Sequence, residues 1–285
     1  MSNVYQLIAS KIPQMSKSQA KIAKYILENP NLVPFFTVGK LAEKTGVSEA
    51  TIVRFANFLG YSGYPELQQY MQHSVQKQLT TVERLQMSHH IYEHEKGVYD
   101  IFQDDIHNIK STMEQLDLSA FKQAVDSILK ANRIYIVANR SAMSLGIFLH
   151  YYLQIILNNV HILKSMETEV EKIYDLSEKD VVIGISFARY TNSTIKMLSY
   201  GKKKGATTIA ITDNLLSPLV PNADIVLTAS SQMPTFIDSF VAPLSLINAL
   251  ITFIGKEKIN DIQIKLETLE DIWDHFGVFY KKEDL

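Results

Sequence analysis

Apolar residues in the first part of the chain recur at helical spacing, in short segments. Ile22 and Ile26 share one face of a helix that we expect to begin after Ser16. Ser16 and Gln19 have the spacing of a capping box, in which each side chain bonds the backbone of the other residue. Pro30 ends this helix, because the residue before a proline avoids helical backbone angles. The pattern therefore predicts a short helix with defined ends.

Two more helices follow with only a few residues between them. One begins at Thr37 and ends at Gly46, and the next begins with a cap at Ser48 and ends at Gly60. A helix, a short turn that contains glycine and a second capped helix form the helix-turn-helix pattern. The first 78 residues are therefore predicted to be an all-α domain that contains this motif.

The hydrophobic rhythm changes further along the chain. Helical patterns cover 98–116 and 119–131, and then short runs rich in Val and Ile alternate with helical stretches. Such runs are typical of parallel strands covered by helices on both faces. The expected strands are Arg133–Ala138, Val160–Leu163, Asp180–Ser186, Thr207–Thr212 and Ile225–Leu227. They predict a doubly wound, parallel-sheet α/β domain.

The chain is thus expected to combine an α and an α/β domain. We assign 1–78 to the helix-turn-helix domain, 79–97 to a polar linker and 98–285 to the α/β domain. Residues 1–80 carry eight Lys and Arg against four Glu, whereas the remainder carries 20 basic against 26 acidic residues. A basic head on an acidic body indicates different partners for the two domains, and compositional drift is the alternative.

The composition excludes several classes of protein. The chain has no cysteine, which excludes disulfides, thiolate zinc sites and cysteine nucleophiles. Its eight histidines are scattered, and we expect no metal and no cofactor. The N-terminal residues do not resemble a secretion signal, and no apolar run approaches the roughly 20 residues that span a bilayer. We therefore expect a cytoplasmic protein that does not enter a membrane.

The third helix carries polar side chains in its first two turns, where a recognition helix contacts DNA in the major groove. Arg54 is suited to guanine or phosphate, and Glu49 to a cytosine amine. This helix also supplies apolar contacts, most of which are expected to face the core of the head, through Val53, Phe55, Ala56 and Leu59. The expected DNA-binding residues are Lys40, Ser48, Glu49, Thr51, Arg54 and Tyr61. A three-helix unit that binds no DNA is the alternative on the pattern alone.

The sequence SEATIVRFANFLGYSGYPEL carries a specific resemblance. Over about residues 1–78 the chain resembles the N-terminal domain of RpiR/MurR-type bacterial transcription regulators, which implies operator binding. One difference is that the family commonly has a lysine where this chain has Gln68 and Gln69. We expect this change to weaken a phosphate contact without affecting the fold.

Three of the expected strands are followed by loops that contain polar residues. These loops lie at the carboxyl ends of the strands, which is where parallel sheets bind ligands. The three segments, each a strand end with its loop, are IYIVANRSAMS, VIGISFARYTNST and AITDNLLSPL. Ser141, Ser186 and Thr191 are residue types that also cap helices, which is their alternative role. Their position after successive strands favours a pocket that binds an anion.

Residues 119–256 resemble a sugar isomerase (SIS) domain, most closely in GATTIAITDNLLSPLVPNADIVL. Where the family commonly has GxGxS, this chain has Ala138–Ala142, and where it has SxSGxT, the chain has Ser186–Thr191. In the second motif, Ser186 and Thr191 match the first and last residues of the family pattern. In each of the two motifs an arginine, Arg140 or Arg189, replaces a glycine of the family. The resemblance implies a phosphosugar-binding module. The expected ligand-binding residues are Asn139, Arg140, Ser141, Ser186, Arg189, Tyr190 and Thr191.

The two arginines, Arg140 and Arg189, change the expected ligand chemistry. Glycine lets the backbone approach a phosphate, whereas arginine presents a planar fork of donors suited to phosphate or carboxylate. Arginines at neighbouring strand ends would hold a small anion, either a phosphosugar or a sugar acid, through their side chains. Structural ion pairs are the alternative.

We therefore predict a bacterial transcription regulator that binds operator DNA and senses a small anionic, phosphosugar-like effector. The alternative is a sugar-phosphate isomerase or etherase with a helical appendage, which would need a positioned base. Glu167, Glu169 and Glu171 follow the second strand, but their spacing near a helix start favours a solvated face. We expect no catalytic residues and no enzyme activity.

The chain is also expected to form a homodimer or homotetramer, because helix-turn-helix proteins commonly read two half-sites. An apolar helix at 236–254 and the segment 148–156 hold more apolar surface than one sheet face needs. Complete burial in the core is the alternative for both.

Overall fold

The computed structural model describes residues 4–76, 81–92, 97–233 and 235–280. The chain forms two compact units. The first contains residues 1–115 with 187–189 and 229–242, and the second contains 116–186, 190–228 and 243–285. The division falls after residue 115, so the helix over 97–114 clusters with the first unit. The domain boundaries that the sequence suggests, at 78 and 97, remain predictions.

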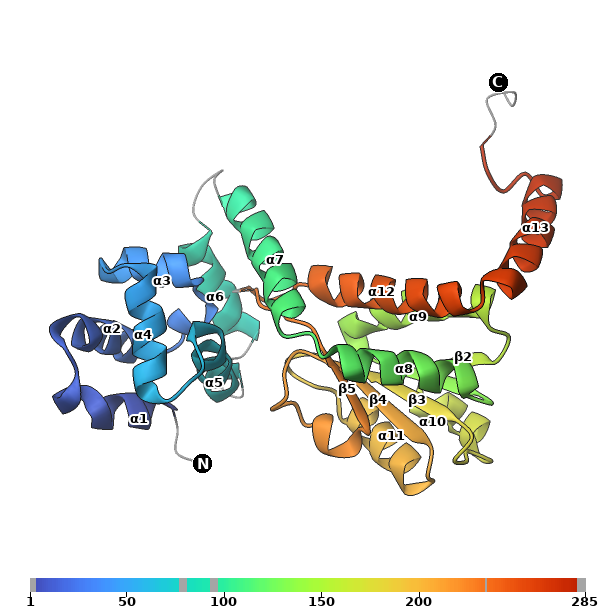
Figure 1. The fold of residues 1–285 in the computed structure, drawn as a ribbon, viewed down its shortest axis with the longest axis horizontal. Helices are drawn as coiled ribbons and strands as arrows, with labels where there is room; N and C mark the ends of the chain where they lie inside the picture. The colour runs from blue at the N-terminus through green and yellow to red at the C-terminus, as the bar shows by residue number, and fades with distance from the viewer. Residues whose placement is uncertain (1–3, 77–80, 93–96, 234, 281–285) are drawn as a thin grey trace. The chain divides into compact units, whose positions relative to one another are not determined.

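The first unit begins with a helical head. Its helices are α1 (Val4–Lys11), α2 (Lys17–Glu28), α3 (Val38–Thr45), α4 (Glu49–Leu59) and α5 (Tyr64–Gln76), with 3-10 turns η1 (Ile12–Gln14) and η2 (Val33–Phe35) (Figure 1). They enclose one core in which Ile22, Ile52, Phe55 and Leu67 are fully buried. The predicted helical head is confirmed.

The helix ends follow from local chemistry. The hydroxyl of Ser16 accepts from the backbone N of Gln19, and the backbone N of Ser16 donates to Gln19 Oε1 at 2.9 Å, which confirms the capping box. Gly46 ends α3 with φ +62°, in the left-handed region that glycine tolerates. Ser48 stands at the N-cap of α4, but its hydroxyl does not cap the backbone. It bonds the hydroxyl of Thr51 at 2.9 Å instead.

Part of the predicted linker is helical. Residues 79–80 and 93–96 of this range lie outside the described residues, but α6 covers Thr81–Ile91 and α7 (Gly97–Glu114) follows it. The buried Arg84 of α6 donates from Nη2 to Asp238 Oδ1 and to the carbonyl of Ile237, both at 2.8 Å. The hydrophobic pattern does not predict α6 because this ion pair, more than an apolar face, holds it.

The second unit is built on a five-stranded parallel sheet. Its strands are β1 (Ile134–Ala138), β2 (Val160–Leu163), β3 (Val181–Ile185), β4 (Thr207–Thr212) and β5 (Ile225–Thr228), in the order β2-β1-β3-β4-β5. All five expected strands and the parallel arrangement are confirmed. The chain order reverses direction at β1 and β3, and such a switch point is where open sheets bind ligands.

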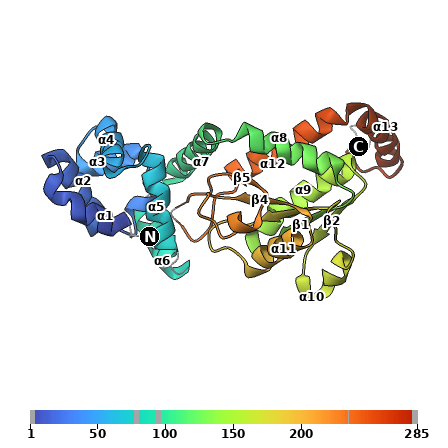
Figure 2. The same cartoon turned by 60° about the horizontal axis from the view of Figure 1, so that its bottom comes forward.

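Helices cover both faces of this sheet. They are α8 (Leu118–Lys130), α9 (Met143–Ile156), α10 (Met166–Glu169), α11 (Asn192–Lys203) and α12 (Val241–Glu257), with 3-10 turns η3 (Arg140–Ala142), η4 (Val170–Ile173) and η5 (Val220–Asn222). The last helix, α13 (Ile259–His275), contacts α9 and has no buried residue. Figures 1 and 2 show α8, α9 and α12 on one face and α10 and α11 on the other. The expected helix over 236–254 begins only at Val241, because 236–240 are loop. Among the described helices, none combines the length and apolar character needed to cross a bilayer.

Gly184 in β3 brings α11 close to the sheet. A Cβ at this position would lie 2.7 Å from Leu198 Cδ1 of α11, which is closer than carbon atoms can pack. The missing side chain therefore lets α11 lie against the strand, with its N-terminus beside the end of β3.

An ion pair between the half-buried Arg133 and a buried carboxylate anchors the opposite edge of the sheet, before β1 and β3. Arg133 donates from Nε to Asp180 Oδ1 at 3.1 Å and from Nη2 to Asp180 Oδ2 at 2.9 Å, and its Nη1 lies 2.6 Å from Asp175 Oδ1. The Asp180 side chain is fully buried and also accepts from the backbone and hydroxyl of Ser177. Burial raises the pKa of Asp180, but the bonds from Arg133 and Ser177 outweigh burial and hold that pKa below its ordinary value.

Candidate functional site

Helix α4 presents a row of polar side chains on one side. Arg54 Nη2 donates to Thr51 Oγ1 at 3.3 Å, and Thr51 in turn bonds the hydroxyl of Ser48. Residues three apart lie on the same side of a helix, and Ser48 and Arg54 are exposed. The opposite side buries Ile52, Phe55, Ala56 and Leu59 in the head core. This arrangement leaves the polar row free to enter a major groove.

The other expected DNA-binding residues lie apart from this row. Glu49 is exposed, and its Oε1 would be 2.9 Å from a Cβ at Gly39, so the carboxylate lies against α3. Lys40 Nζ lies 5.5 Å from the ring centroid of Phe36. Tyr61 is half-buried and packs on the head core. These three side chains could contact DNA beside α4, or they could serve only the packing of the head.

The head contains two features that sequence reasoning missed. Of the four apolar residues, most of them expected to face the core, Val53 is the exception, since it is 39% exposed and lies beside Arg54. Gln68, expected to replace a phosphate-binding lysine, is buried and donates to the carbonyl of Phe36 at 2.9 Å. Gln72 repeats this contact one turn later, donating to the carbonyl of Pro34 at 2.7 Å. The glutamine at 68 therefore holds η2 against α5 instead of facing solvent.

In the second unit, the loops after β1 and β3 meet at the switch point. Asn139 Nδ2 donates to Thr194 Oγ1 at 3.0 Å, and Thr194 bonds the hydroxyl of Thr191 at 2.8 Å. The buried Ser186 accepts from the backbone N of Thr191 at 3.2 Å. Four polar side chains are thus linked at the N-terminus of α11. Sequence reasoning missed Thr194, although a hydroxyl three residues after Thr191 was a signal for it.

Tyr190 closes the same edge of the sheet at β4. Its hydroxyl donates to both carboxylate oxygens of Asp213, at 2.8 and 3.1 Å. Burial raises the pKa of Tyr190, and the charge of Asp213 raises it further. The phenol therefore stays protonated and acts as a donor.

Both expected arginines adopt a backbone conformation that suits glycine. Arg140 has φ +56° and Arg189 has φ +62°, and they are the non-glycine residues with positive φ in the described part of the chain. A non-glycine residue in this region carries about 1–2 kcal/mol of strain. Arg140 and the neighbouring Ser141 are exposed, whereas Arg189, in the first unit, donates from Nη1 to the hydroxyl of Thr81. The chain thus keeps the backbone shape of a glycine loop while carrying arginine.

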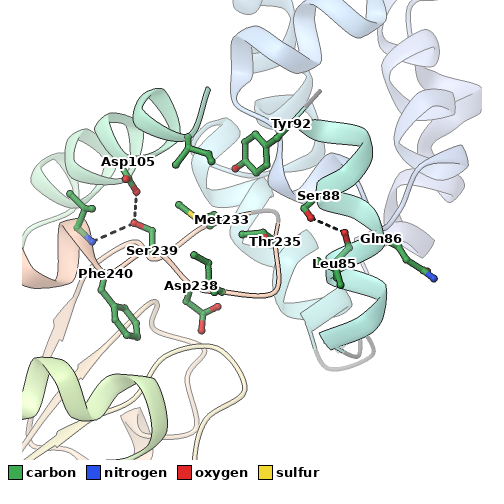
Figure 3. A pocket seen from close by; sticks show the side chains of 13 residues that line it. Leu85, Gln86, Ser88, Tyr92, Asp105, Met233, Thr235, Asp238, Ser239 and Phe240 are labelled. Atoms are coloured by element: carbon green, nitrogen blue, oxygen red, sulfur yellow. Dashed lines mark hydrogen bonds between the residues drawn. The ribbon is translucent and has the colours of Figure 1, made fainter. Parts of the chain in front are cut away.

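The first unit also contains an open cavity of about 960 Å³ between α6, α7 and the residues at 233 and 235–241 (Figure 3). Its lining is mostly apolar and includes Leu85, Met233 and Phe240. Its two carboxylates already have donors, since Asp105 accepts from Ser239 and Asp238 from Arg84. None of the expected ligand-binding residues lines it. An acidic, apolar lining does not suit an anion, so the strand-end loops are the better candidate for an anionic ligand.

The two parts of the chain match known domains. Residues 2–78 match the helix-turn-helix domain of the rpiR family, and residues 127–253 match the SIS domain. An uncharacterized HTH-type transcriptional regulator of Caldanaerobacter subterraneus is 29% identical, over 95% of this chain and 97% of the relative. The HTH-type transcriptional regulator HexR of Pseudomonas aeruginosa is 24% identical, over 95% of both chains.

Solved structures agree with this assignment. The sugar isomerase domain of an RpiR transcription factor from Sphaerobacter thermophilus has a TM-score of 0.60 at 25% identity, and the match covers 62% of this chain and 99% of that one. The Vibrio vulnificus NanR protein, complexed with ManNAc-6P, has a TM-score of 0.59 at 19% identity, covering 98% of this chain and all of that one, which supports the fold.

A helix-turn-helix head with an exposed polar row on α4, joined to a parallel-sheet SIS domain, is the organisation of a DNA-binding transcriptional regulator. Its relatives over nearly the whole chain are named as regulators of this kind. The chain belongs to the RpiR-type regulators, with a SIS domain after the head.

Proposed function

We propose that the SIS domain of this regulator senses a small anionic metabolite, a phosphosugar or sugar acid, and that the domain is not an enzyme. The observation that supports the anion most directly is the pair of left-handed arginines. A strained backbone is retained only where something else favours the side chain. Because guanidinium groups match phosphate and carboxylate, an anionic ligand accounts for arginine where glycine would carry no strain.

The surroundings of Arg140 support the same ligand class. The loops after β1 and β3 lead into α9 and α11, and helix N-termini favour negative charge. We propose that Asn139, Ser141, Ser186, Tyr190 and Thr191 complete the ligand site with Arg140. Arg189 belongs to the first unit, where it bonds Thr81, and its part in ligand binding stays a prediction. ManNAc-6P, with which the similar NanR protein is complexed, is an example of this chemistry.

The acidic residues after β2 support a role without catalysis. Glu167 and Glu171 are exposed. Glu169 bonds Lys172 Nζ at 2.6 Å and accepts from the backbone of Lys164, and the bond to Lys172 lowers its pKa. A general base is more effective when its pKa is raised toward neutrality, and this carboxylate is shifted the other way.

We also propose that the regulator acts as a homodimer or homotetramer in the cytoplasm, where the chromosome is. Two heads would read the two half-sites of an operator. Within the expected segment 148–156, Tyr151 and Tyr152 of α9 are exposed, and Ile147 beside them is exposed as well. These side chains are available for a contact between copies.

Arg54→Ala is expected to weaken operator binding by about 1–3 kcal/mol, because the substitution removes a bidentate contact from the guanidinium group to a base. The measurement is a gel-shift titration with the region upstream of the regulator's own operon. Lys24→Ala is the matched control, since Lys24 is an exposed lysine on α2 whose ion pair among the described residues is with the neighbouring Glu28. Equal affinity of the Arg54→Ala and wild-type proteins would exclude α4 as the recognition helix.

Arg140→Gly is expected to change stability and ligand affinity in opposite directions. Relief of the left-handed strain should raise the free energy of unfolding by about 0.5–1 kcal/mol, after the entropy cost of glycine. Loss of the guanidinium should weaken effector binding by about 1.5–3 kcal/mol. Ser186→Ala and Thr191→Ala should cost less, about 0.5–1.5 kcal/mol each.

The effector is first sought in a thermal-shift screen of sugar phosphates and sugar acids, because a ligand of the native state raises its apparent stability. Isothermal titration of the hit then compares wild type, Arg140→Gly and the control Lys196→Ala, an exposed cation on α11. Wild-type affinity in Arg140→Gly would show that the arginine does not bind the effector. A neutral sugar as the best ligand would contradict an anion site.

A further inference from the structure

Helix α7 carries a row of large apolar side chains, of which all but the half-buried Ile109 are exposed in the described chain. Tyr99 is 74% exposed, Phe102 63% and Met113 70%. Spacings of three and four residues put the whole row on one side of the helix. Its members are Val98, Tyr99, Phe102, Ile106, Ile109 and Met113. Soluble proteins rarely leave such a continuous apolar stripe in water, and it usually marks an interface.

The polar side of α7 faces its own unit instead. The buried Asn108 donates to the carbonyl of Gln232 at 2.7 Å and accepts from the hydroxyl of Ser230 at 2.7 Å. Asp105 accepts from the hydroxyl of Ser239 at 2.5 Å, beside the cavity in Figure 3. These contacts fix the rotation of α7 about its axis. Its apolar stripe is therefore held outward.

The spacing of the stripe selects a helix as its partner. Tyr99, Phe102, Ile106, Ile109 and Met113 are separated by three, four, three and four residues, which is the spacing of the a and d positions of a coiled coil. Such a seam is self-complementary, since the same positions from two copies interdigitate. In this register Asp105 occupies position g and Lys110 position e.

We propose that α7 pairs in parallel with α7 of a second copy of this chain. In a parallel pair, position g of one helix lies beside position e of the next heptad of the other. Asp105, whose Oδ1 accepts from Ser239 of its own chain, would therefore meet the partner's Lys110 through Oδ2, twice by symmetry. An antiparallel pair would instead place g beside g and e beside e, with no opposite charges matched. The charge pattern therefore favours the parallel orientation.

A parallel seam would orient the two DNA-binding heads. Tyr92 packs against the head core, and its hydroxyl donates to Asp104 of α7 at 2.6 Å, so α7 is tied to its own head. Two parallel α7 helices hold both heads at the same end of the pair, as reading of two half-sites requires. This consequence rests on the proposed oligomeric regulator, whereas the seam itself rests on the stripe.

The absence of cysteine permits a direct test by cross-linking. Single variants Ile106→Cys and Met113→Cys of the full chain are oxidised and run on a non-reducing gel, with Glu114→Cys as the control on the polar side of α7. Parallel pairing predicts disulfide-linked dimers for both seam variants and few for the control, because the same a positions of two helices face each other. Cross-linking of Ile106→Cys alone would overturn the parallel orientation, and cross-linking of neither would overturn the seam.

A second test measures mass by light scattering. Phe102→Asp is expected to raise the dissociation constant of the assembly at least tenfold, whereas Gln103→Asp on the flank changes it little. Circular dichroism checks that both variants fold. A monomeric wild type, or a Phe102→Asp protein of unchanged mass at every concentration, would overturn the proposal. A cross-linked pair that does not bind operator would instead count against the proposed function and leave the seam in place.

Discussion

Operator affinity is expected to fall about 10³- to 10⁵-fold between 50 and 200 mM salt, if two heads make about six to ten phosphate contacts. Each phosphate contact releases condensed counterions, so the logarithm of affinity falls linearly with the logarithm of salt concentration. The head carries eight Lys and Arg against four Glu, which supplies the required positive charge. The SIS domain belongs to the acidic remainder of the chain and should add nothing to this slope.

The slope also distinguishes two roles for Arg54. If Arg54 reads a base, Arg54→Ala lowers affinity at every salt concentration and leaves the slope unchanged. If it contacts a phosphate, the slope falls by about one. The measurement is fluorescence anisotropy with a labelled operator duplex at five or more salt concentrations. An affinity that does not depend on salt would contradict binding by the basic head.

Arg133→Met is expected to lower the free energy of unfolding by about 3 kcal/mol, because it leaves the charge of Asp180 buried without its cation. Ser177 continues to donate to Asp180, which keeps the loss at the lower end for a broken buried pair. Urea unfolding of the full chain, followed by circular dichroism, measures the change. Lys202→Met is the control, since its ion pair with Asp224 is exposed and should cost less than about 1 kcal/mol.

The same pair should make stability depend on pH in a defined direction. The pKa of Asp180 is lowered in the folded protein, so its contribution is present above the unfolded value of about 3.9 and is lost as pH falls through the folded pKa. The difference in stability between wild type and Arg133→Met should therefore be largest near neutral pH and shrink below pH of about 4. A difference that grows in acid would show that Asp180 is not the group responsible.

Most of the fold could be predicted because local signals and the hydrophobic period agree. The Ser16 capping box, the end of α3 at Gly46 and all five strands depend on neighbouring residues or on continuous Val and Ile runs. These features need no knowledge of distant contacts. Helix α6 could not be predicted in this way, since the partner of its Arg84 lies more than 150 residues along the chain, at Asp238.

The sequence predicted which residue types lie at the candidate sites, but it did not predict the contacts that these residues make. The motif positions Ser186 and Thr191 lie together at the strand ends, but the connecting role of Thr194 depends on how α11 packs. Gln68 could not be assigned from the sequence, because its carbonyl partner at Phe36 lies on another element. The left-handed conformation of Arg140 was implied only by the glycine that it replaces.

The segment 229–242 comes late in the chain but completes the first unit, and this has a consequence for biosynthesis. The partners of Arg84 and Asn108 are Asp238, Ser230 and Gln232, which leave the ribosome only after all five strands. Chains emerge at about 5–20 residues per second, so α6 and α7 wait roughly 6 to 30 seconds for these contacts. During that interval the apolar stripe of α7 sits on an incompletely anchored helix in the nascent chain. If α7 pairs as proposed, neighbouring ribosomes on one messenger would bring such stripes close together, and chains made side by side would pair with one another.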